Sequence, residues 1–201
     1  MSFMEKSEAL IIVAHPDDET IWMGGMILRN NNWKWTIISL CRANDLDRKP
    51  KFDRVCGIYN ANGFISDLDD EVLHPIRLNE IVDRIKNLIS KKNYKFIFTH
   101  GENGEYGHIR HIEVHKAVEE MVNNKELIGE KVYYFNYKKG KNVPYPSLIA
   151  PEPIEDADFV LKLTDKELES KKEIIRSIYG YPNDRGFELI SCNKMESFSI
   201  K

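Results

Sequence analysis

The sequence predicts an α/β fold with a mostly parallel sheet flanked by helices, and three observations support this prediction. First, the β-branched runs at residues 9–13 and 35–41 have the apolar character of interior parallel strands. Second, a helix-length segment separates them, as in a right-handed βαβ crossover. Third, a chain of 201 residues, 42% of them hydrophobic, can bury one substantial core but is too short for two complete domains. We therefore expect a single domain over residues 1–201.

The elements after the second strand continue the alternation. Residues 42–51 are charged and predict a loop, and helices are predicted over 52–62, which ends in Asn-Gly, and over 79–91, which is amphipathic. Residues 65–71 are acidic and irregular, and they lack the spacing of a calcium-binding EF-hand loop, so a solvated loop is predicted. Further strands are expected at residues 95–99, 132–137 and 159–163, and further helices at residues 108–123 and 164–179. A proline-rich loop at residues 144–153 could cover the site or bind a partner, and its composition favours neither.

Charge and composition exclude several classes of protein. The net charge of -3 arises from 29 basic and 32 acidic residues that are well interspersed, which gives no basic surface for nucleic acid. Residues 1–8 lack the pattern of a signal peptide, and no apolar run has the length of a membrane span, so we expect a cytoplasmic protein without membrane contact. The three cysteines are odd in number and widely spaced, which favours reduced, packed thiols over disulfides. The sequence is compatible with a homo-oligomer.

Residues with ligand chemistry follow the first strand directly. The segment Ala-His-Pro-Asp-Asp-Glu at residues 14–19 brings His15, Asp17 and Asp18 to the point where a helix begins. The carboxyl ends of strands in open α/β sheets are where ligands bind. A simple helix cap would explain one aspartate, but it leaves the histidine and the second aspartate without a role. These side chains therefore indicate a cation site.

A second group of histidines follows the strand at residues 95–99. His100 ends that strand, and His108, His111 and His115 lie at a predicted helix start, so five of the six histidines of the chain fall in these two places. Imidazole and carboxylate ligands suit Zn²⁺ or another divalent transition metal, with three protein ligands and a position open for water. His15 and Asp18 can converge on one ion, with Asp17 beside it. Spacing alone does not choose among the helix histidines, although packed structural roles are favoured for His100 and His115.

The two segments together resemble the LmbE/PIG-L family of zinc-dependent N-acetylglucosaminyl deacetylases. The resemblance rests on the hexapeptide at 14–19 and on Tyr-Gly-His-x-x-His-x-x-x-His at 106–115, and it covers at least residues 9–123 in the expected order. It implies a Rossmann-like α/β fold and a set of roles for the matching residues. The implied metal ligands are His15, Asp18 and His111; the implied catalytic residues are Asp17 as general base, His108 as oxyanion stabiliser and Tyr106 near the reacting group; and the implied substrate-binding residue is Arg54.

The resemblance also implies a reaction and a substrate class. A metal-dependent hydrolase of this kind removes an acetyl group from the amide nitrogen of a small N-acetylglucosamine-type substrate, releasing acetate and a free amine. The expected partner is thus a small N-acetylated sugar. Two alternatives remain open: a catalytically impaired metal-binding protein of the same fold, and a hydrolase of a non-sugar amide. A nucleotide-binding fold is disfavoured because no GxGxxG follows a strand.

One position departs from the family pattern. Family members commonly have His-x-Asp-His, in which the aspartate pairs with the first histidine, whereas Arg110 stands here. A nearby cation would disfavour a protonated His108. We predict that His108 titrates lower than in relatives unless Glu102, Glu105 or Glu113 takes the place of the missing acid.

Overall fold

The computed structural model describes residues 7–142 and 149–201 of the chain, and its core is one seven-stranded sheet. The strands of this sheet are β1 (Glu8–Val13), β2 (Lys34–Cys41), β3 (Asn62–Leu68), β4 (Asn93–Thr99), β5 (Ile128–Phe135), β8 (Phe159–Lys162) and β9 (Met195–Ile200). A separate two-stranded sheet pairs β6 (Tyr137–Asn142) with β7 (Ile149–Pro153). The helices are α1 (Asp18–Arg29), α2 (Arg48–Ile58), α3 (Leu78–Leu88), α4 (Gly104–Gly107), α5 (Ile109–Asn123), α6 (Asp165–Glu173), the π-helical turn η1 (Ile174–Tyr179) and α7 (Phe187–Ser191).

The order of the strands places a topological switch point in the middle of the sheet. The order is β3-β2-β1-β4-β5-β9-β8, and β1 to β5 are parallel, whereas β9 and β8 pair antiparallel. The predicted α/β fold with a mostly parallel, Rossmann-like sheet is therefore confirmed. Since β1 lies between β2 and β4, the chain leaves the middle of the sheet in opposite directions, and the crevice beyond the carboxyl ends of β1 and β4 is the expected place for a ligand.

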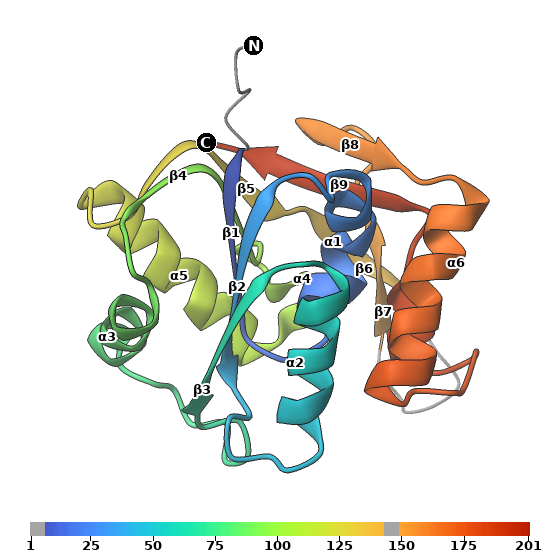
Figure 1. The fold of residues 1–201 in the computed structure, drawn as a ribbon, viewed down its shortest axis with the longest axis horizontal. Helices are drawn as coiled ribbons and strands as arrows, with labels where there is room; N and C mark the ends of the chain where they lie inside the picture. Colours follow the sequence, from blue (N-terminus) through green and yellow to red (C-terminus); the bar gives the residue numbers. More distant parts are fainter. Residues whose placement is uncertain (1–6, 143–148) are drawn as a thin grey trace.

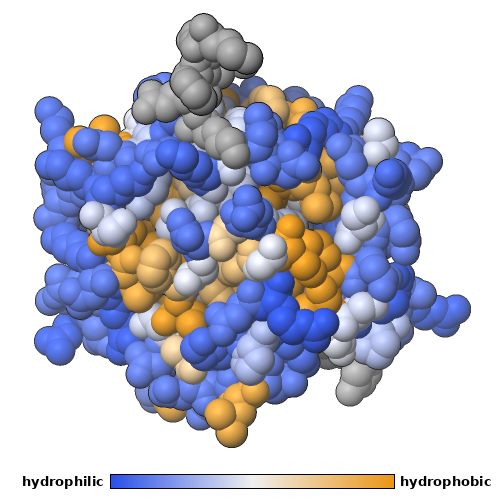
Figure 2. Space-filling model, in the orientation of Figure 1, coloured by the Kyte–Doolittle hydropathy of each residue, from blue (hydrophilic) through white to orange (hydrophobic). Residues whose placement is uncertain are grey.

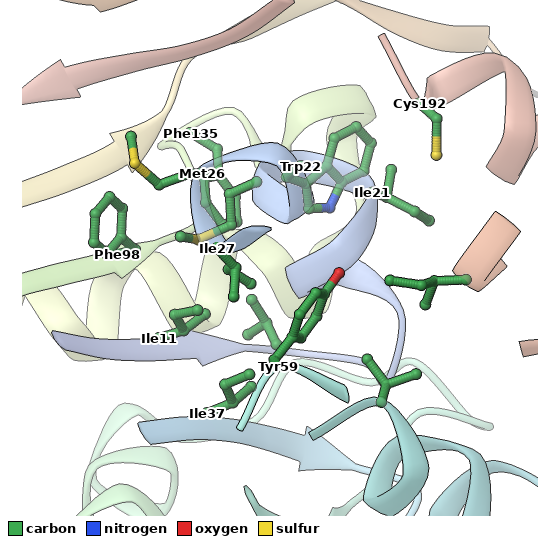
Figure 3. Close-up of a cluster of buried hydrophobic side chains, with 14 of the residues drawn as sticks. Ile11, Ile21, Trp22, Met26, Ile27, Ile37, Tyr59, Phe98, Phe135 and Cys192 are labelled. Atoms are coloured by element: carbon green, nitrogen blue, oxygen red, sulfur yellow. The ribbon is translucent and has the colours of Figure 1, made fainter. Parts of the chain in front are cut away.

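Helices cover both faces of the sheet. Figure 1 shows α3 and α5 on one side of the strands and α1, α2 and α6 on the other. In β1, Leu10 and Ile12 belong to the core cluster under α3 and α5, whereas Ile11 and Val13 face the cluster that contains α1 and α2. The period-2 alternation of a strand explains this division, and because both faces are buried, the strand has a continuous apolar sequence. Figure 3 shows the second cluster, in which Ile11 lies beside Ile37 and below Ile27.

Helix α1 is interrupted, and a buried ion pair supports the interruption. Met23 has non-helical dihedral angles, and the carboxylate of Glu196 on β9 accepts hydrogen bonds from the backbone N–H groups of Gly25 and Met26, both at 2.8 Å. The same carboxylate pairs with the ammonium group of Lys171 at 2.7 Å, and both side chains are fully buried. The second half of α1 thus has a charged cap supplied from the far end of the chain.

Several predicted boundaries were wrong. Helix α2 begins at Arg48, inside the segment 42–51 that was predicted as a loop, since a proline at position 50 is tolerated in the first turn of a helix. The predicted loop at 65–71 contains the end of β3, an edge strand whose mostly exposed side chains give no apolar alternation. Strand β9 and helix α7 were not predicted. Within the proline-rich segment, residues 143–148 lie outside the described residues, and 149–153 form β7.

The outside of the molecule is largely polar. Figure 2 shows hydrophilic residues around most of the visible periphery, with apolar residues gathered in the hollows between elements. Across residues 7–142 and 149–201, no helix combines the length and apolarity needed to cross a membrane. Cys41, Cys56 and Cys192 are free and buried, which agrees with the prediction of packed, reduced thiols.

Candidate functional site

A pocket of about 290 Å³ opens at the carboxyl edge of the sheet, beside the switch point. Its walls come from the turn after β1, the loops after β2 and β3, the segment after β4, and residues 181–188 near the end of the chain. Both sequence motifs therefore meet in one cavity. Its lining is mixed and includes carboxylates, histidines, arginines and aromatic rings.

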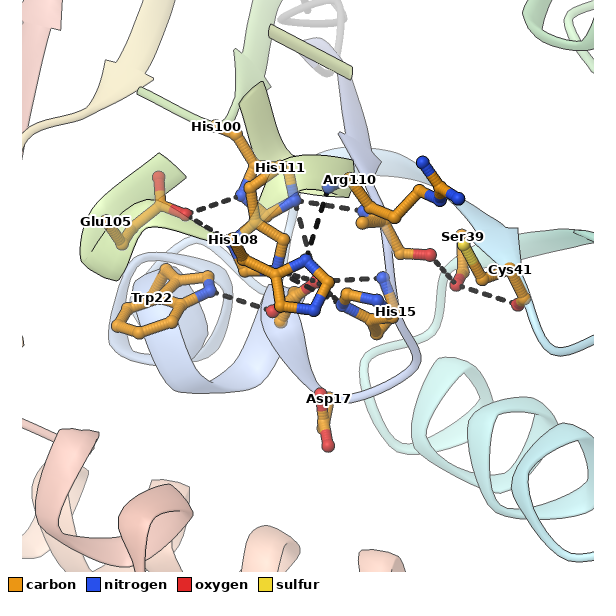
Figure 4. Close-up of polar contacts among 12 residues, drawn as sticks. His15, Asp17, Trp22, Ser39, Cys41, His100, Glu105, His108, Arg110 and His111 are labelled. Atoms are coloured by element: carbon orange, nitrogen blue, oxygen red, sulfur yellow. Dashed lines mark hydrogen bonds and ion pairs between the residues drawn. The ribbon is translucent and has the colours of Figure 1, made fainter. Parts of the chain in front are cut away.

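Ligand atoms of His15, Asp18 and His111 lie close together where His15 and Asp18 line this pocket. Figure 4 shows the two histidines side by side. His15 Nδ1 lies 3.1 Å from Asp18 Oδ2 and 3.1 Å from His111 Nε2, and the distance from His111 Nε2 to Asp18 Oδ2 is 3.4 Å. His15 and Asp18 belong to the strand-to-helix turn after β1, whereas His111 is in the first turn of α5. The structure thus brings together the three residues that the resemblance implied as metal ligands.

The spacing of these atoms fits a divalent metal ion. Two ligands, each about 2.0–2.1 Å from a tetrahedral zinc ion, are roughly 3.3–3.4 Å apart, and smaller angles bring them somewhat closer. The cluster also requires a cation: although burial opposes it, the carboxylates of Asp18 and Asp70 raise the pKa of His15 to about 10, so a proton occupies the cluster when no metal does. Two nitrogens and one carboxylate oxygen are a common ligand set for zinc and related transition metals.

The atoms His15 Nδ1, Asp18 Oδ2 and His111 Nε2 form a ligand triangle. Each of these three side chains also makes a hydrogen bond to a residue outside the triangle. Glu105 Oε2 lies 2.6 Å from Nδ1 of His111, which directs Nε2 of that ring to the site. Asp70 Oδ1 lies 3.0 Å from Nε2 of His15. Trp22 Nε1 donates to the other oxygen of Asp18 at 2.9 Å. Carboxylate–histidine pairs of this kind fix the tautomer and orientation of metal-binding rings.

Two other histidines of the second group, His100 and His115, are packed within the fold. His100 is fully buried, stacks on the ring of His111 with centroids 3.9 Å apart, and accepts a hydrogen bond from the backbone N–H of Ala14. His115 Nδ1 lies 2.9 Å from the backbone carbonyl oxygen of His100, away from the pocket. Packed roles for these two residues agree with the expectation from the sequence. His100 Nε2 is nevertheless 3.5 Å from Asp18 Oδ2, close to the ligand cluster.

His108 lies at the mouth of the ligand cluster as a neutral ring. Its Nδ1 accepts a hydrogen bond from the backbone N–H of Arg110, so the proton of the neutral ring is on Nε2. Burial, together with the nearby rings of His111 and His15, lowers the pKa of His108 to about 3. This lowering is relative to the ordinary pKa of histidine, and its causes are desolvation and the neighbouring histidines rather than the charge of Arg110. That His108 titrates lower than in relatives stays a prediction.

Arg110 does not face His108, and the three glutamates considered as substitutes do not reach it either. The guanidinium of Arg110 is fully buried and pairs with Glu113 at 2.6 Å. Glu105 is engaged with His100 and His111, and Glu102 is exposed. The carboxylate near His108 is instead that of Asp70, with Oδ1 4.0 Å from His108 Nε2. Asp70 comes from the acidic segment after β3 that was predicted to be a solvated loop.

Asp17 lines the pocket but is turned away from the ligand triangle (Figure 4). Its carboxylate accepts hydrogen bonds from Tyr181 Oη at 3.0 Å and from Arg48 at 3.2 Å. Its backbone has φ of 112°, a strained value for a residue other than glycine, and the buried carboxylate of Glu19 accepts a hydrogen bond from its N–H. Burial and the adjacent charge of Asp18 raise the pKa of Asp17 to about 8, although Arg48 opposes the shift.

The aromatic wall includes Tyr106, but the predicted arginine is absent from the pocket. The ring of Tyr106 lies 5.7 Å from that of His108 and 4.8 Å from that of Phe187, centroid to centroid. Arg54 is exposed on α2 and does not line the pocket. The arginine of α2 that lines the cavity is instead Arg48, in the first turn of the helix.

Several contributors to the pocket were missed from the sequence, among them Asp70, Trp22 and Tyr181. Asp70 could have been found from its position directly after a strand, had β3 been recognised. Trp22 lies at i+4 from Asp18 on one helical face, a spacing that could have suggested the contact. Tyr181 has no local signal, since it reaches Asp17 across 164 positions of sequence.

A known protein family matches the part of the chain that carries both motifs. The sequence model of the family PIG-L, described as GlcNAc-PI de-N-acetylase, matches residues 10–122, which include both motifs. A relative from Acanthamoeba polyphaga mimivirus, the uncharacterized protein L374, is 27% identical over 186 residues, covering 84% of this chain and 80% of its own length. The segment that the family model matches, residues 10–122, contains the ligand triangle, whereas Tyr181 and Phe187 lie beyond that segment.

Solved structures share the fold at low sequence identity. The N,N'-diacetylchitobiose deacetylase of Pyrococcus horikoshii superposes with a TM-score of 0.67 at 16% identity, covering 99% of this chain and 85% of that one. The 4-carboxy-2-hydroxymuconate hydratase GalB of Pseudomonas putida KT2440 has a TM-score of 0.58 at 16% identity, covering 88% of this chain and 80% of that one. The same architecture therefore carries more than one reaction.

Proposed function

Because this chain belongs to the PIG-L family, whose description is GlcNAc-PI de-N-acetylase, we propose that it is a metal-dependent amide hydrolase that removes the acetyl group from a small N-acetylglucosamine-type substrate. One observation carries the proposal: three ligand atoms of His15, Asp18 and His111 lie 3.1–3.4 Å from one another, and His15 and Asp18 line an open pocket. These residues would hold a metal where a reacting group in the pocket could reach it.

The metal that this site would hold is Zn²⁺ or another divalent transition metal. When bound, such an ion supplies Lewis acidity, which polarises the acetyl carbonyl and increases the acidity of water. The protein contributes the geometry. Glu105 and Asp70 set the tautomers of the two histidine ligands, and Trp22 holds the second oxygen of Asp18, so the three ligands need little reorganisation.

His108 is proposed to stabilise the oxyanion as a neutral hydrogen-bond donor. Because Nδ1 accepts from the backbone, Nε2 carries a proton that it can donate to an oxygen in the pocket. A neutral donor performs this role without protonation of the ring. The departure at position 110 is thus compatible with activity, because the role does not depend on a cationic His108.

Asp17 is proposed to accept, in its ionised form, the proton of the attacking water and to return it to the leaving amine. A cation held by His15, Asp18 and His111 would lower its raised pKa and favour that form. In the ligand-free protein its carboxylate is paired with Arg48 and Tyr181. Binding of substrate in the pocket must therefore release Asp17 from at least one of these partners, and a rotation of its side chain would direct the carboxylate to the reacting carbon. The buried contact of Glu19 with the backbone N–H of Asp17 holds the turn while the side chain moves.

The size and lining of the pocket support a small substrate. A volume of about 290 Å³ lies near the lower end of the usual range for small-molecule sites. Tyr106 and Phe187 offer apolar faces against which a sugar ring can pack, and Arg42 and Arg48 offer donors for hydroxyl or anionic groups. These features favour one N-acetylated sugar with a modest substituent.

A second candidate function is hydration, because the hydratase GalB has the same fold.

The proposal is tested by removing bound metal with a chelator, restoring one equivalent of Zn²⁺, and measuring acetate release from a panel of N-acetylglucosaminides and non-sugar N-acetyl amides. The proposal predicts acetate from at least one glucosaminide, only after metal is restored. Turnover of non-sugar amides alone would reject the sugar assignment. Tight metal binding with no acetate from any amide would favour an impaired enzyme or a hydratase.

A further inference from the structure

Arg110 is a fully buried cation whose partners all belong to its own helix or to a single loop. Its guanidinium donates to the backbone carbonyl oxygen of Asp69, to the carboxylate of Asp69 at 3.1 Å, and to Glu113 at 2.6 Å. Burial of a charge is costly unless it is paired and hydrogen-bonded. A buried arginine with this many contacts to one loop therefore indicates that the position of the loop matters.

Glu113 extends the same network to the other end of the loop. Its second oxygen accepts a hydrogen bond at 2.8 Å from the backbone N–H of Ile76. Arg110 and Glu113, one helical turn apart on α5, thus grip residues 69–76 at both ends. Between the ends the loop has little apolar anchoring, since Val72 and Leu73 are 62% and 43% exposed. We call this pair the Arg110–Glu113 clamp.

The residue that the loop delivers to the site is Asp70. Its Oδ1 lies 3.0 Å from Nε2 of His15, and its Oδ2 accepts from Arg42 at 2.6 Å. When a metal takes the place of the proton on Nδ1, a hydrogen bond from Nε2–H to this carboxylate would leave the lone pair of Nδ1 directed toward Asp18 and His111. The carboxylate also lies 4.0 Å from Nε2 of His108.

We propose that Asp70 is a positioning residue of the metal site and that the Arg110–Glu113 clamp holds it there. The inference rests on the proposed function, because it assigns to Asp70 the orientation of a metal-binding histidine. In this proposal Arg110 anchors the loop after β3, and that loop brings the carboxylate of Asp70 to His15 and His108. A carboxylate near His108 thus comes from the loop after β3 rather than from position 110.

The test measures Zn²⁺ affinity by competition with a chromophoric chelator, together with the visible spectrum of the Co²⁺-substituted protein. Asp70→Asn keeps the shape of the side chain but removes its charge, and we expect the affinity for Zn²⁺ to fall about 10- to 100-fold with an altered Co²⁺ spectrum. Glu71→Gln is the matched control, because it removes an exposed carboxylate next to Asp70 and should leave both readouts unchanged. An affinity of Asp70→Asn within about threefold of the native value would overturn the assignment.

The clamp is tested by a double-mutant cycle. Arg110→Met combined with Glu113→Gln removes both buried charges together, so neither is left unpaired, and the glutamine can still accept from Ile76. We expect this variant to bind Zn²⁺ about as weakly as Asp70→Asn, and the addition of Asp70→Asn to it to cause little further loss. Full additivity of the two losses would show that the clamp does not act through Asp70. If the clamp variant fails to fold, Asp69→Asn provides a milder test, because it weakens the contact with Arg110 at a partly exposed carboxylate. This variant should show a smaller loss of Zn²⁺ affinity, and no loss would count against the clamp.

These results are distinguishable from a failure of the proposed function. If the native protein binds Zn²⁺ but releases no acetate, the deacetylase assignment fails while the metal-affinity comparison still decides the role of Asp70. If the native protein releases acetate and Asp70→Asn binds Zn²⁺ normally, the proposed function stands and the role of Asp70 is rejected.

Discussion

The buried pair of Lys171 and Glu196 gives a prediction whose magnitude follows from the structure. Both side chains are fully buried, and Glu196 also accepts from two backbone N–H groups at the break in α1. Lys171→Met leaves a buried carboxylate without its cation, and Glu196→Gln leaves a buried ammonium without its anion. Loss of one partner of a buried pair costs about 3–5 kcal/mol of unfolding free energy.

The double variant Lys171→Met/Glu196→Gln should recover most of this loss. Neither charge remains, and the glutamine oxygen can still accept from the N–H groups of Gly25 and Met26. For a chain of 201 residues, each kcal/mol corresponds to roughly 2–4 °C in melting temperature. The single variants should therefore melt roughly 6–20 °C below the native protein, with the double variant much closer to it.

Thermal and urea denaturation, followed by circular dichroism with chelator present, measures the four members of this cycle. The chelator removes any contribution of metal binding to the apparent stability. A double variant whose loss equals the sum of the two single losses would refute the reasoning, because the two charges would then act independently.

Three further predictions concern other parts of the molecule. Glu105→Gln should lower Zn²⁺ affinity about 10- to 100-fold in a chelator titration, because its carboxylate orients His111; unchanged affinity would contradict this. Ile11→Ala should lower the unfolding free energy by about 2–5 kcal/mol in urea, since its side chain is fully buried; a loss under 1 kcal/mol would argue against tight packing there. The hydrogen bond from Arg29 lowers the pKa of Glu167 to about 2, so the stability it contributes is present above the ordinary pKa of 4.5 and is lost as the pH falls toward 2. The difference in melting temperature between the native protein and Glu167→Gln should shrink over that interval, and a constant difference would exclude the linkage.

The parallel half of the fold could be predicted because its strands are buried on both faces. Strands β1, β2 and β4 each contain a buried, mostly apolar run, and the histidines and carboxylates that follow β1 and β4 are conspicuous in the sequence. Strand β3 lies at an edge with mostly exposed side chains, so its sequence resembles a loop and Asp70 was overlooked. Because the segment after β3 was predicted to be a solvated loop, the contacts of Arg110 with Asp69 could not be anticipated either.

Contacts between distant parts of the chain could not be predicted from local patterns. Tyr181 reaches Asp17, and Glu196 reaches α1, through tertiary packing that no periodicity or spacing encodes. The choice of Arg54 has a different origin, because it came from the resemblance alone, whereas the structure places Arg48, in the first turn of α2, at the pocket. The ligand triangle, in contrast, required only that two strand ends be neighbours in the sheet.

The most direct test of the central proposal compares acetate release by the native protein and by Asp17→Asn, each loaded with one equivalent of Zn²⁺. Asp45→Asn serves as the matched control, since Asp45 lines the same pocket and an asparagine can still accept the hydrogen bonds from the start of α2. We predict that Asp17→Asn binds Zn²⁺ but loses at least about 100-fold in rate, whereas Asp45→Asn retains most of the activity. Equal rates for the native protein and Asp17→Asn would contradict the proposed mechanism.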